Sequence, residues 1–405
     1  MEILSCENVA FKYNESTDYA ISDCTFSVKK GEKIMLCGAS GSGKSTLLRL
    51  LKRELSPRGE LSGNITLMGK DRSELSDRES AEKIGFVMQS PDSQTVCDKV
   101  SAELAFGLES FGVKSGEIQS RVGEMAAFFG IEPLYDRDIS TLSGGQKQLV
   151  ALCSVMVTDP DILLLDEPTA QLDPVAAREL LGILDRLNKE MGVTIIIAEH
   201  DPEELFDSCD KILYLAKGKT EFFGTPALTA KYFVENALEG FLPETSKAFS
   251  GLCDDLPLNV RQGRAKLEKL GVTDIPKQAV TDTERAEPYA LQCKNLWQRY
   301  EKNSPDILKG CDLGIRKGEC YGLLGSTGGG KSTLLRVICG LCKPYMGTVS
   351  LFGKKQKAYK NGSLFREMLA FLPQEPVTMF VKESVREDLL QSGDKVTVEN
   401  VSQRM

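Results

Sequence analysis

The sequence lacks the features of a secreted, membrane-spanning or nucleic-acid-binding protein. No apolar run approaches the roughly 18–20 residues that cross a bilayer, and the first residues lack the basic and then apolar pattern of a signal peptide. Basic residues are not in excess, because 50 Lys and Arg stand against 58 Asp and Glu, for a net charge of −8. A general nucleic-acid binder usually needs a strongly basic face. We therefore expect a cytoplasmic protein without a nucleic-acid partner, which meets a membrane only through another subunit.

Cysteine and histidine give little sign of a metal centre. The 12 cysteines have no regular spacing, and Cys339 and Cys342 form a lone CxxC without a second half. We expect these two to be small residues near a helix end, in a reducing compartment where disulfides are rare. The lysines between residues 354 and 360 are expected to form a solvated loop. The chain has a single histidine, His200.

The length and an internal repeat indicate a duplicated domain. A single hydrophobic core rarely grows past about 250–300 residues, so a chain of 405 residues is expected to hold two or more domains. Two glycine-rich loops, around Lys44 and Lys331, lie 287 residues apart, and Gln89 and Gln374 lie 285 apart. Such a nearly constant offset predicts a domain duplication with a small change in loop length.

The repeat also sets the expected domain boundaries. The first domain is predicted at residues 1–227, a C-terminal extension and linker at 228–288, and the second domain at 289–405. Proline and glycine interrupt short helical patterns in the linker. At the same offset, the counterpart of Ser143 would fall beyond residue 405. The second domain is therefore expected to be incomplete.

The first glycine-rich loop, Gly38–Thr46, fits the phosphate-binding pattern GxxxxGK[ST]. It follows the apolar run Ile34–Cys37 and leads into a helical pattern, which is the context that the motif needs. Backbone N–H groups and a helix N-terminus attract phosphate, with Lys44 predicted at the β- and γ-phosphates and Ser45 at Mg²⁺. The arrangement recurs after the run Cys320–Leu324. The residues predicted to bind nucleotide in the two loops are Gly38, Ser40, Gly41, Gly43, Lys44, Ser45 and Thr46, and Gly325, Gly328, Gly330, Lys331, Ser332 and Thr333.

Two further apolar runs end in polar residues suited to hydrolysis. The run that ends in Asp166 and Glu167 is typical of a central parallel strand buried on both faces. Because side chains alternate along a strand, Asp166 can face the Mg²⁺ shell while Glu167 faces an attacking water. His200 follows a second such run, at the end of a strand where α/β folds bind ligands, and is predicted to contact the γ-phosphate.

A third motif, Leu142–Gln146, precedes a helical pattern. The sequence of Ser143, Gly144 and Gly145 is a good helix N-cap and turn. The two glycines also allow phosphate to approach the backbone at the positive end of the helix dipole. All three residues are predicted to contact nucleotide.

In order and spacing, these residues resemble the ATP-binding cassette (ABC) family. The motifs that carry the resemblance are the aromatic Tyr13, Walker A at Gly38–Thr46, the Q-loop Gln89, the signature Leu142–Gln146, Walker B at Ile162–Glu167, the D-loop Ala170–Asp173 and the H-loop His200. The second copy matches from about residue 291 to 390, through Tyr300, Gly325–Thr333 and Gln374.

The resemblance implies an α/β fold of the P-loop NTPase class, present in duplicate. The family fold has a RecA-like core, a small antiparallel β-subdomain and a helical subdomain, which in the first copy would be inserted between Gln89 and Ser143. It also implies ATP and Mg²⁺ as cofactors and head-to-tail pairing, in which each ATP lies between one domain's Walker A and another's signature. Tyr13 and Tyr300 would stack on adenine, and Gln89 would link its site to a membrane partner. The residues implied around Mg²⁺ are Ser45, Gln89, Asp166, Ser332 and Gln374, and those implied in catalysis are Glu167, His200 and Gln89.

Within ABC proteins, Gln89–Gln94 and Glu199–Asp201 are similar to the ATPases of energy-coupling factor importers, which take up vitamins or transition metal ions. The tandem arrangement, with Leu256–Leu258 before the linker, is similar to the fused ATPases of that group. This resemblance implies an ATP-hydrolysing subunit at the cytoplasmic face of the cell membrane. Its partners would be a transmembrane transporter subunit and a substrate-binding membrane subunit.

Two other functions remain open at this point. A soluble tandem ABC ATPase in translation or repair predicts a basic helical linker, whereas this linker is mixed in charge and interrupted. A catalytically inert regulatory subunit is disfavoured for the first domain by Glu167 and His200, but it stays open for the second domain.

Because the sequence contains one signature, we predict that the chain hydrolyses ATP as a homodimer of first domains or by pairing with another ABC ATPase. Turnover per molecule should then rise with protein concentration, in parallel with a shift to larger species in gel filtration. Turnover by a monomer that does not depend on concentration would contradict this prediction.

Overall fold

The computed structural model describes residues 1–14, 16–253, 255–271, 288–302, 304–325, 328–359, 363–373 and 379–392. The chain divides into two compact units, residues 1–279 and 280–405. The part of the chain predicted as a linker includes residues 272–287, which lie outside the described residues.

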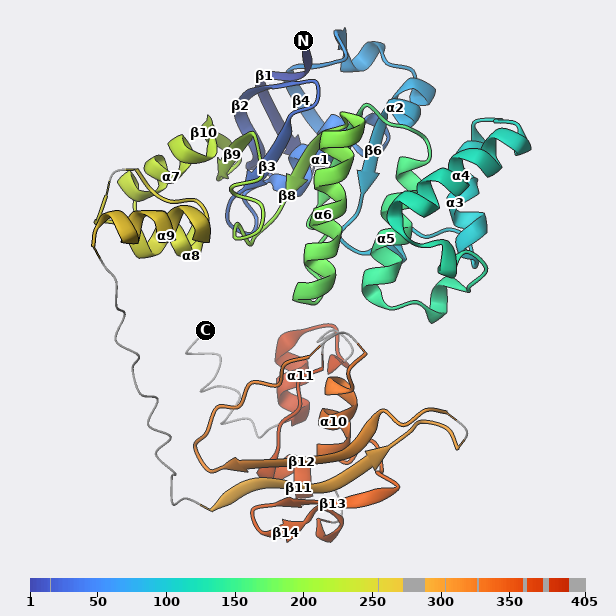
Figure 1. The fold of residues 1–405 in the computed structure, drawn as a ribbon, viewed down its shortest axis with the longest axis vertical. Coiled ribbons are helices and arrows are strands. Elements are labelled where there is room, and N and C mark those ends of the chain that lie inside the picture. The colour runs from blue at the N-terminus through green and yellow to red at the C-terminus, as the bar shows by residue number, and fades with distance from the viewer. Residues whose placement is uncertain are drawn as a thin grey trace. The chain divides into compact units, whose positions relative to one another are not determined.

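The first unit is built on a six-stranded sheet in the order β10-β9-β3-β8-β7-β6 (Figure 1). The five strands from β9 to β6 are parallel, and β10 pairs with β9 in the antiparallel sense. Every residue of β3, β6, β7 and β8 is buried, as expected for apolar strands covered on both faces. The strands are β3 (Lys33–Cys37), β6 (Ile84–Val87), β7 (Ile162–Asp166), β8 (Thr194–Ala198), β9 (Lys211–Ala216) and β10 (Lys219–Gly224).

A second, antiparallel sheet in the order β2-β1-β4-β5 packs with α1 on one side of this core. Alternating burial along β1 and β2 gives each strand one apolar face, which joins the cluster around Leu36 and Leu48. Tyr13 is the last residue of β1, and its partly buried side chain packs against this cluster. The elements are β1 (Glu2–Tyr13), β2 (Tyr19–Lys29), β4 (Gly59–Leu67), β5 (Lys70–Asp71) and α1 (Lys44–Leu51).

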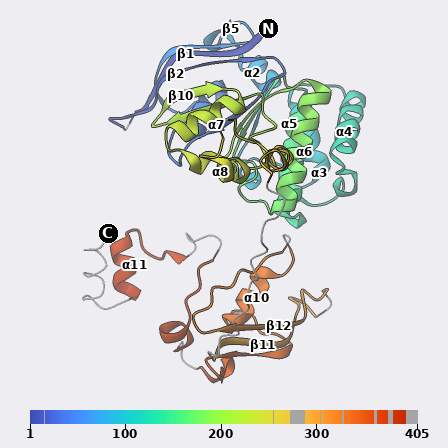
Figure 2. The ribbon, with the colours of Figure 1, turned by 60° about the vertical axis from the view of Figure 1, so that its left-hand side comes forward.

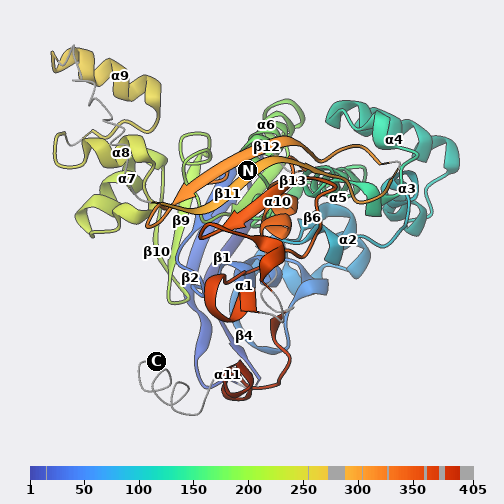
Figure 3. The ribbon, with the colours of Figure 1, turned by 90° about the horizontal axis from the view of Figure 1, so that it is seen from below.

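Two groups of helices in the first unit lie on opposite sides of the sheets (Figures 1 and 3). One group, α3 to α5, is inserted between β6 and β7, and the other, α7 to α9, follows β10. The helices are α2 (Asp77–Lys83), α3 (Val100–Ser110), α4 (Ser115–Phe129), α5 (Gly144–Met156), α6 (Pro174–Met191), α7 (Pro226–Glu235), α8 (Glu244–Phe249) and α9 (Val260–Lys269). Short 3₁₀ helices lie at Arg53–Leu55, Arg72–Glu74, Pro91–Ser93, Glu132–Leu134, Ile139–Thr141 and Glu239–Phe241.

The second unit contains an antiparallel sheet in the order β12-β11-β13-β14, with α10 packed against it (Figure 2). Val337 of α10 and Leu296 of β11 are fully buried in the small core between them. The elements are β11 (Tyr289–Gln298), β12 (Leu308–Arg316), β13 (Met346–Leu351), β14 (Lys354–Lys355), α10 (Lys331–Ile338) and α11 (Val385–Ser392), with a 3₁₀ helix at Gln356–Ala358 and a π-helix at Leu364–Met368.

The architecture confirms the predicted α/β fold, with its parallel core, antiparallel subdomain and helical insertion. One local expectation is wrong. The run Cys320–Leu324, expected to repeat β3, is not a strand, and Leu324 is 93% exposed. Parallel neighbours equivalent to β8 and β9 are absent among the described residues of this unit, so the run has no backbone partners for a ladder.

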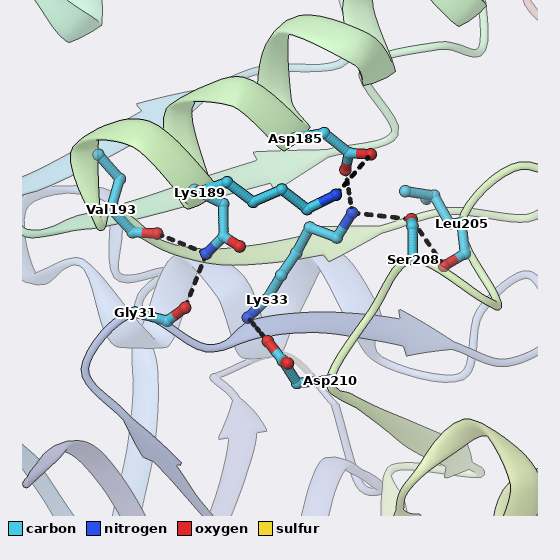
Figure 4. Close-up of polar contacts among 9 residues, drawn as sticks. Gly31, Lys33, Asp185, Lys189, Val193, Leu205, Ser208 and Asp210 are labelled. Atoms are coloured by element: carbon cyan, nitrogen blue, oxygen red, sulfur yellow. Dashed lines mark hydrogen bonds and ion pairs between the residues drawn. The ribbon is translucent and has the colours of Figure 1, made fainter.

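The end of the sheet at which β3 begins carries a buried polar network (Figure 4). Lys33 is 2% exposed, and its ammonium group pairs with Asp185 of α6 and donates to Ser208 Oγ at 2.7 Å. The backbone N–H of Lys33 donates to the Asp210 carboxylate at 2.7 Å, and Lys189 lies 3.9 Å from Asp185. This network fastens the second half of α6 to the start of β3.

We predict that K33A lowers the free energy of unfolding of the first unit by about 3 kcal/mol, because it removes one member of a largely buried pair. K30A is the matched control, since the Lys30–Asp161 pair is exposed on the lysine side and should contribute less than about 1 kcal/mol. Urea unfolding followed by far-UV circular dichroism measures both, because the single tryptophan, Trp297, lies in the second unit. Equal losses in the two variants would contradict the assignment.

Candidate active site

The loop after β3 is shaped for a phosphate group by two glycines that no other residue could replace. Gly43 caps α1 with φ +103°, and an added Cβ would lie 2.7 Å from the carbonyl oxygen of Ala20. A Cβ on Gly38 would lie 2.3 Å from the carbonyl oxygen of Leu215. No side chain caps the N-terminus of α1, so its first N–H groups can face a bound anion.

Lys44, the first residue of α1, folds back over this loop. Its side chain is almost fully buried, and Nζ donates to the carbonyl oxygens of Gly38 at 2.8 Å and Ala39 at 3.2 Å. Burial lowers the pKa of Lys44, while the charges of Glu167 and Asp166 oppose that effect. The Lys44 ammonium group is therefore held beside the loop by two backbone carbonyl oxygens.

Ser45 and Asp166 meet at the start of α1. Ser45 Oγ donates to Asp166 Oδ1 at 2.8 Å, and Asp166 is 4% exposed at the end of β7. Burial raises the pKa of Asp166, and the hydrogen bond from Ser45 opposes that rise. A hydroxyl and a carboxylate oxygen fit Mg²⁺, which usually takes one or two carboxylates together with phosphate oxygens. Among the described residues, no group of three or more His, Cys, Asp or Glu could hold a metal ion.

Glu167 lies between the other two predicted catalytic side chains. Its Oε1 is 2.7 Å from His200 Nε2, and its Oε2 accepts a hydrogen bond from Gln89 Nε2 at 3.1 Å. The backbone of Glu167 has φ +48°, a left-handed conformation that is uncommon for a residue with a side chain. Its N–H donates to the carbonyl oxygen of Ala198 on β8 at 2.9 Å, which fixes this strained turn.

Tyr13 lines another part of the same site. Its hydroxyl lies 2.9 Å from Thr46 Oγ1, and its ring meets Phe11 edge to face with centroids 5.0 Å apart. Together these elements enclose a cavity of about 390 Å³. Its lining consists of Tyr13, Ala20, Ser40, Gly41, Gly43, Lys44, Ser45, Thr46, Glu167 and His200. Of these residues, only Ala20 was not predicted from the sequence, because an alanine carries no chemical signal.

The signature residues do not line this cavity. Ser143 caps α5 and forms a capping box with Gln146, with Ser143 N–H to Gln146 Oε1 at 3.0 Å and Gln146 N–H to Ser143 Oγ at 3.3 Å. Gly144 and Gly145 form the first turn of α5. A contact of these three residues with nucleotide would therefore need a second domain, and it stays a prediction.

The second unit repeats the local geometry of the loop. Lys331 Nζ donates to the carbonyl oxygen of Gly325 at 2.6 Å, and the Tyr300 hydroxyl lies 3.1 Å from Thr333 Oγ1. Gly330 caps α10 as Gly43 caps α1. Other predicted members are Gly328 and Ser332, which are exposed, and Gln374, which lies outside the described residues.

The sequence matches the family described as ABC transporter over residues 21–170 and 308–405. The chain belongs to the ABC transporter ATP-binding proteins. A protein of that name from Bacillus thuringiensis is 38% identical over 384 residues, which cover 94% of this chain and 69% of the relative. Another, from Methanosarcina mazei, is 34% identical over 95% of this chain and 68% of its own length.

Solved structures agree with the family. CbiO1 from Clostridium perfringens, described as part of the ABC transporter complex CbiONQ, is 34% identical, with a TM-score of 0.53 over 59% of this chain and 94% of that one. A nucleotide-free ATP-binding cassette from an ABC transporter is 25% identical, with a TM-score of 0.51 over 60% of this chain and all of that one. This ABC protein is therefore an enzyme that binds and hydrolyses ATP.

We predict that E167Q lowers ATP turnover at least about 100-fold while ATP affinity changes little, because the amide keeps the size of the side chain but cannot accept a proton from water. Steady-state phosphate release and titration with a fluorescent ATP analogue measure the two quantities. E32Q is the control, since Glu32 pairs with Lys211 away from the cavity and should leave turnover unchanged. Unchanged turnover in E167Q would exclude Glu167 as the key carboxylate.

Proposed function

We propose that this ABC ATPase is the motor subunit of an energy-coupling factor importer for a vitamin or a transition metal ion. The observation that carries the proposal is one cavity lined by Lys44, Glu167 and His200, with Asp166 hydrogen-bonded to Ser45 of its lining, in a chain 34% identical to CbiO1. CbiO1 belongs to a transporter complex, and the two proteins share the cassette fold.

In the proposed site each side chain has one role. Tyr13 stacks on adenine, the loop from Gly38 to Thr46 holds the phosphates, and Lys44 neutralises them. Ser45 and Asp166, with Gln89, hold Mg²⁺, which supplies positive charge at the phosphate oxygens. Glu167 orients the attacking water, and His200 contacts the γ-phosphate. The second loop, with Tyr300, Lys331, Ser332, Thr333 and Gln374, is proposed as a further nucleotide site.

Pairing of domains is part of the proposal. The cavity holds the phosphate loop and Glu167, whereas Ser143 does not line it and caps α5. A second cassette that brings its own Ser143–Gly145 to this cavity would complete it, from another copy or another ABC ATPase. The domain limits 1–227, 228–288 and 289–405 remain those proposed from the sequence.

The proposal also places the protein on the cytoplasmic face of the membrane, through partners. Among the described residues, no helix is long and apolar enough to cross a bilayer. A transmembrane subunit and a substrate-binding membrane subunit would supply the transport path. Specificity for the solute would then lie in those chains.

Deletion of the gene tests the transport proposal. The mutant cells should lose uptake of one labelled vitamin or metal ion, such as cobalt or nickel, and the intact gene should restore it. The E167Q gene should not restore uptake, although its product should co-purify with an integral membrane subunit in detergent. Normal uptake of the whole panel, together with co-sedimentation of the protein with ribosomes, would contradict the proposal and favour the soluble alternative.

A further inference from the structure

A buried carboxylate next to the active site has no role in the chemistry proposed above. Glu199 follows β8 directly and is 4% exposed, yet it does not line the ATP cavity. Burying a carboxylate is costly unless hydrogen bonds replace the lost water. A neutral residue of similar size would avoid this cost. The presence of a buried acid here therefore suggests a specific structural task.

Glu199 accepts two hydrogen bonds from Thr169 and one more from the backbone of His200. Its Oε1 accepts from the Thr169 backbone N–H at 3.0 Å and from Thr169 Oγ1 at 2.7 Å. Burial raises the pKa of Glu199, and the hydrogen bonds from Thr169 and from the His200 backbone oppose that rise. Hydrogen bonds to a charged acceptor are the stronger kind, so this contact holds Thr169 firmly.

Thr169 stands at the entrance to the D-loop. Its carbonyl oxygen accepts from the N–H of Leu172 at 2.9 Å, and the next residue, Asp173, caps α6 by accepting from the N–H groups of Val175 and Ala176. The position of Thr169 thus sets where this loop and the first turn of α6 begin.

Two side-chain contacts therefore join the segments that leave β7 and β8. One contact is His200 with Glu167, and the other is Glu199 with Thr169. Glu199 and His200 are adjacent in the chain, and Glu167 and Thr169 are two residues apart. The four residues thus form a closed ring of contacts next to the D-loop.

We propose that Glu199 is a positioning residue, which holds His200 and Glu167 in alignment with the D-loop through Thr169. The proposal rests on the roles proposed for Glu167 and His200. It gives the D-loop a direct mechanical connection to the hydrolytic groups, separate from the phosphate loop. ATP binding, which depends on the cavity lining, should be unaffected by this connection.

Thr169 provides the most conservative test, because valine has the same shape as threonine without the hydroxyl. In the full-length protein, T169V should lower kcat about tenfold, as expected for loss of a hydrogen bond to a charged group. The affinity for a fluorescent ATP analogue should stay within about twofold of the unmodified protein. T169S, which keeps the hydroxyl, should return kcat to within about twofold.

A double-mutant cycle with E199Q tests the coupling. Since both changes disturb the same contact, T169V/E199Q should be no slower than the slower single variant. T229V is the matched control, because Thr229 is also buried and hydrogen-bonded, to the carbonyl oxygen of Thr225 at 2.9 Å in α7, away from the cavity. It should leave kcat unchanged whatever its effect on the melting temperature.

Two results would overturn the proposal. One is a T169V protein that melts at a lower temperature but keeps full kcat, which would make the contact purely structural. The other is multiplication of the two single effects in the double variant, which would show that the residues act independently. Full turnover in E167Q would instead reject the role of Glu167, so the two failures are distinguishable.

Discussion

The parallel ladder between β7 and β8 is the constraint on which the active site depends. In this ladder Asp166 pairs with Ala198, so the residues that follow the two strands leave the sheet side by side. The Glu167 carboxylate and the His200 imidazole then meet at 2.7 Å, although 33 positions separate them in the sequence. A shift of one residue would turn alternate side chains to the other face of the sheet and separate this pair. The fully buried apolar faces of both strands make such a shift costly.

The two units share the loop motif but differ in the sheet beside it. The difference separates what the loop itself determines from what the sheet determines. In both, a lysine folds onto the loop carbonyl and a tyrosine hydroxyl contacts a threonine of the following helix. Lys44 is 4% exposed in the first unit, whereas Lys331 is only half-buried in the second, where the described residues form no parallel sheet. The contacts of the lysine and the tyrosine therefore depend on the loop and the helix that follows it, and they do not need a preceding strand. Burial of the lysine requires the sheet.

The buried network around Lys33 and the candidate active site lie at opposite ends of the central sheet. Where β3 begins, Lys33 is enclosed by Asp185, Ser208 and the backbone of neighbouring segments, and the network joins α6 to the core. Where β7 ends, Glu167 has a left-handed backbone and two polar partners. Such strain is tolerated only where the surrounding structure fixes it. The buried network at one end thus fixes the core that holds the strained turn of Glu167 at the other end.

The sequence by itself determined the class of fold, the duplication and the family, because glycine spacing, apolar runs and capping residues act over a few neighbours. It also indicated which residues end each buried strand. Tertiary structure alone decided that Gln89 and His200 bind the two oxygens of Glu167, that Ser143 lies outside the cavity, and that Cys320–Leu324 is not a strand. These features depend on which strands are neighbours and on what covers them. That information resides in contacts between distant segments, and local sequence patterns do not carry it.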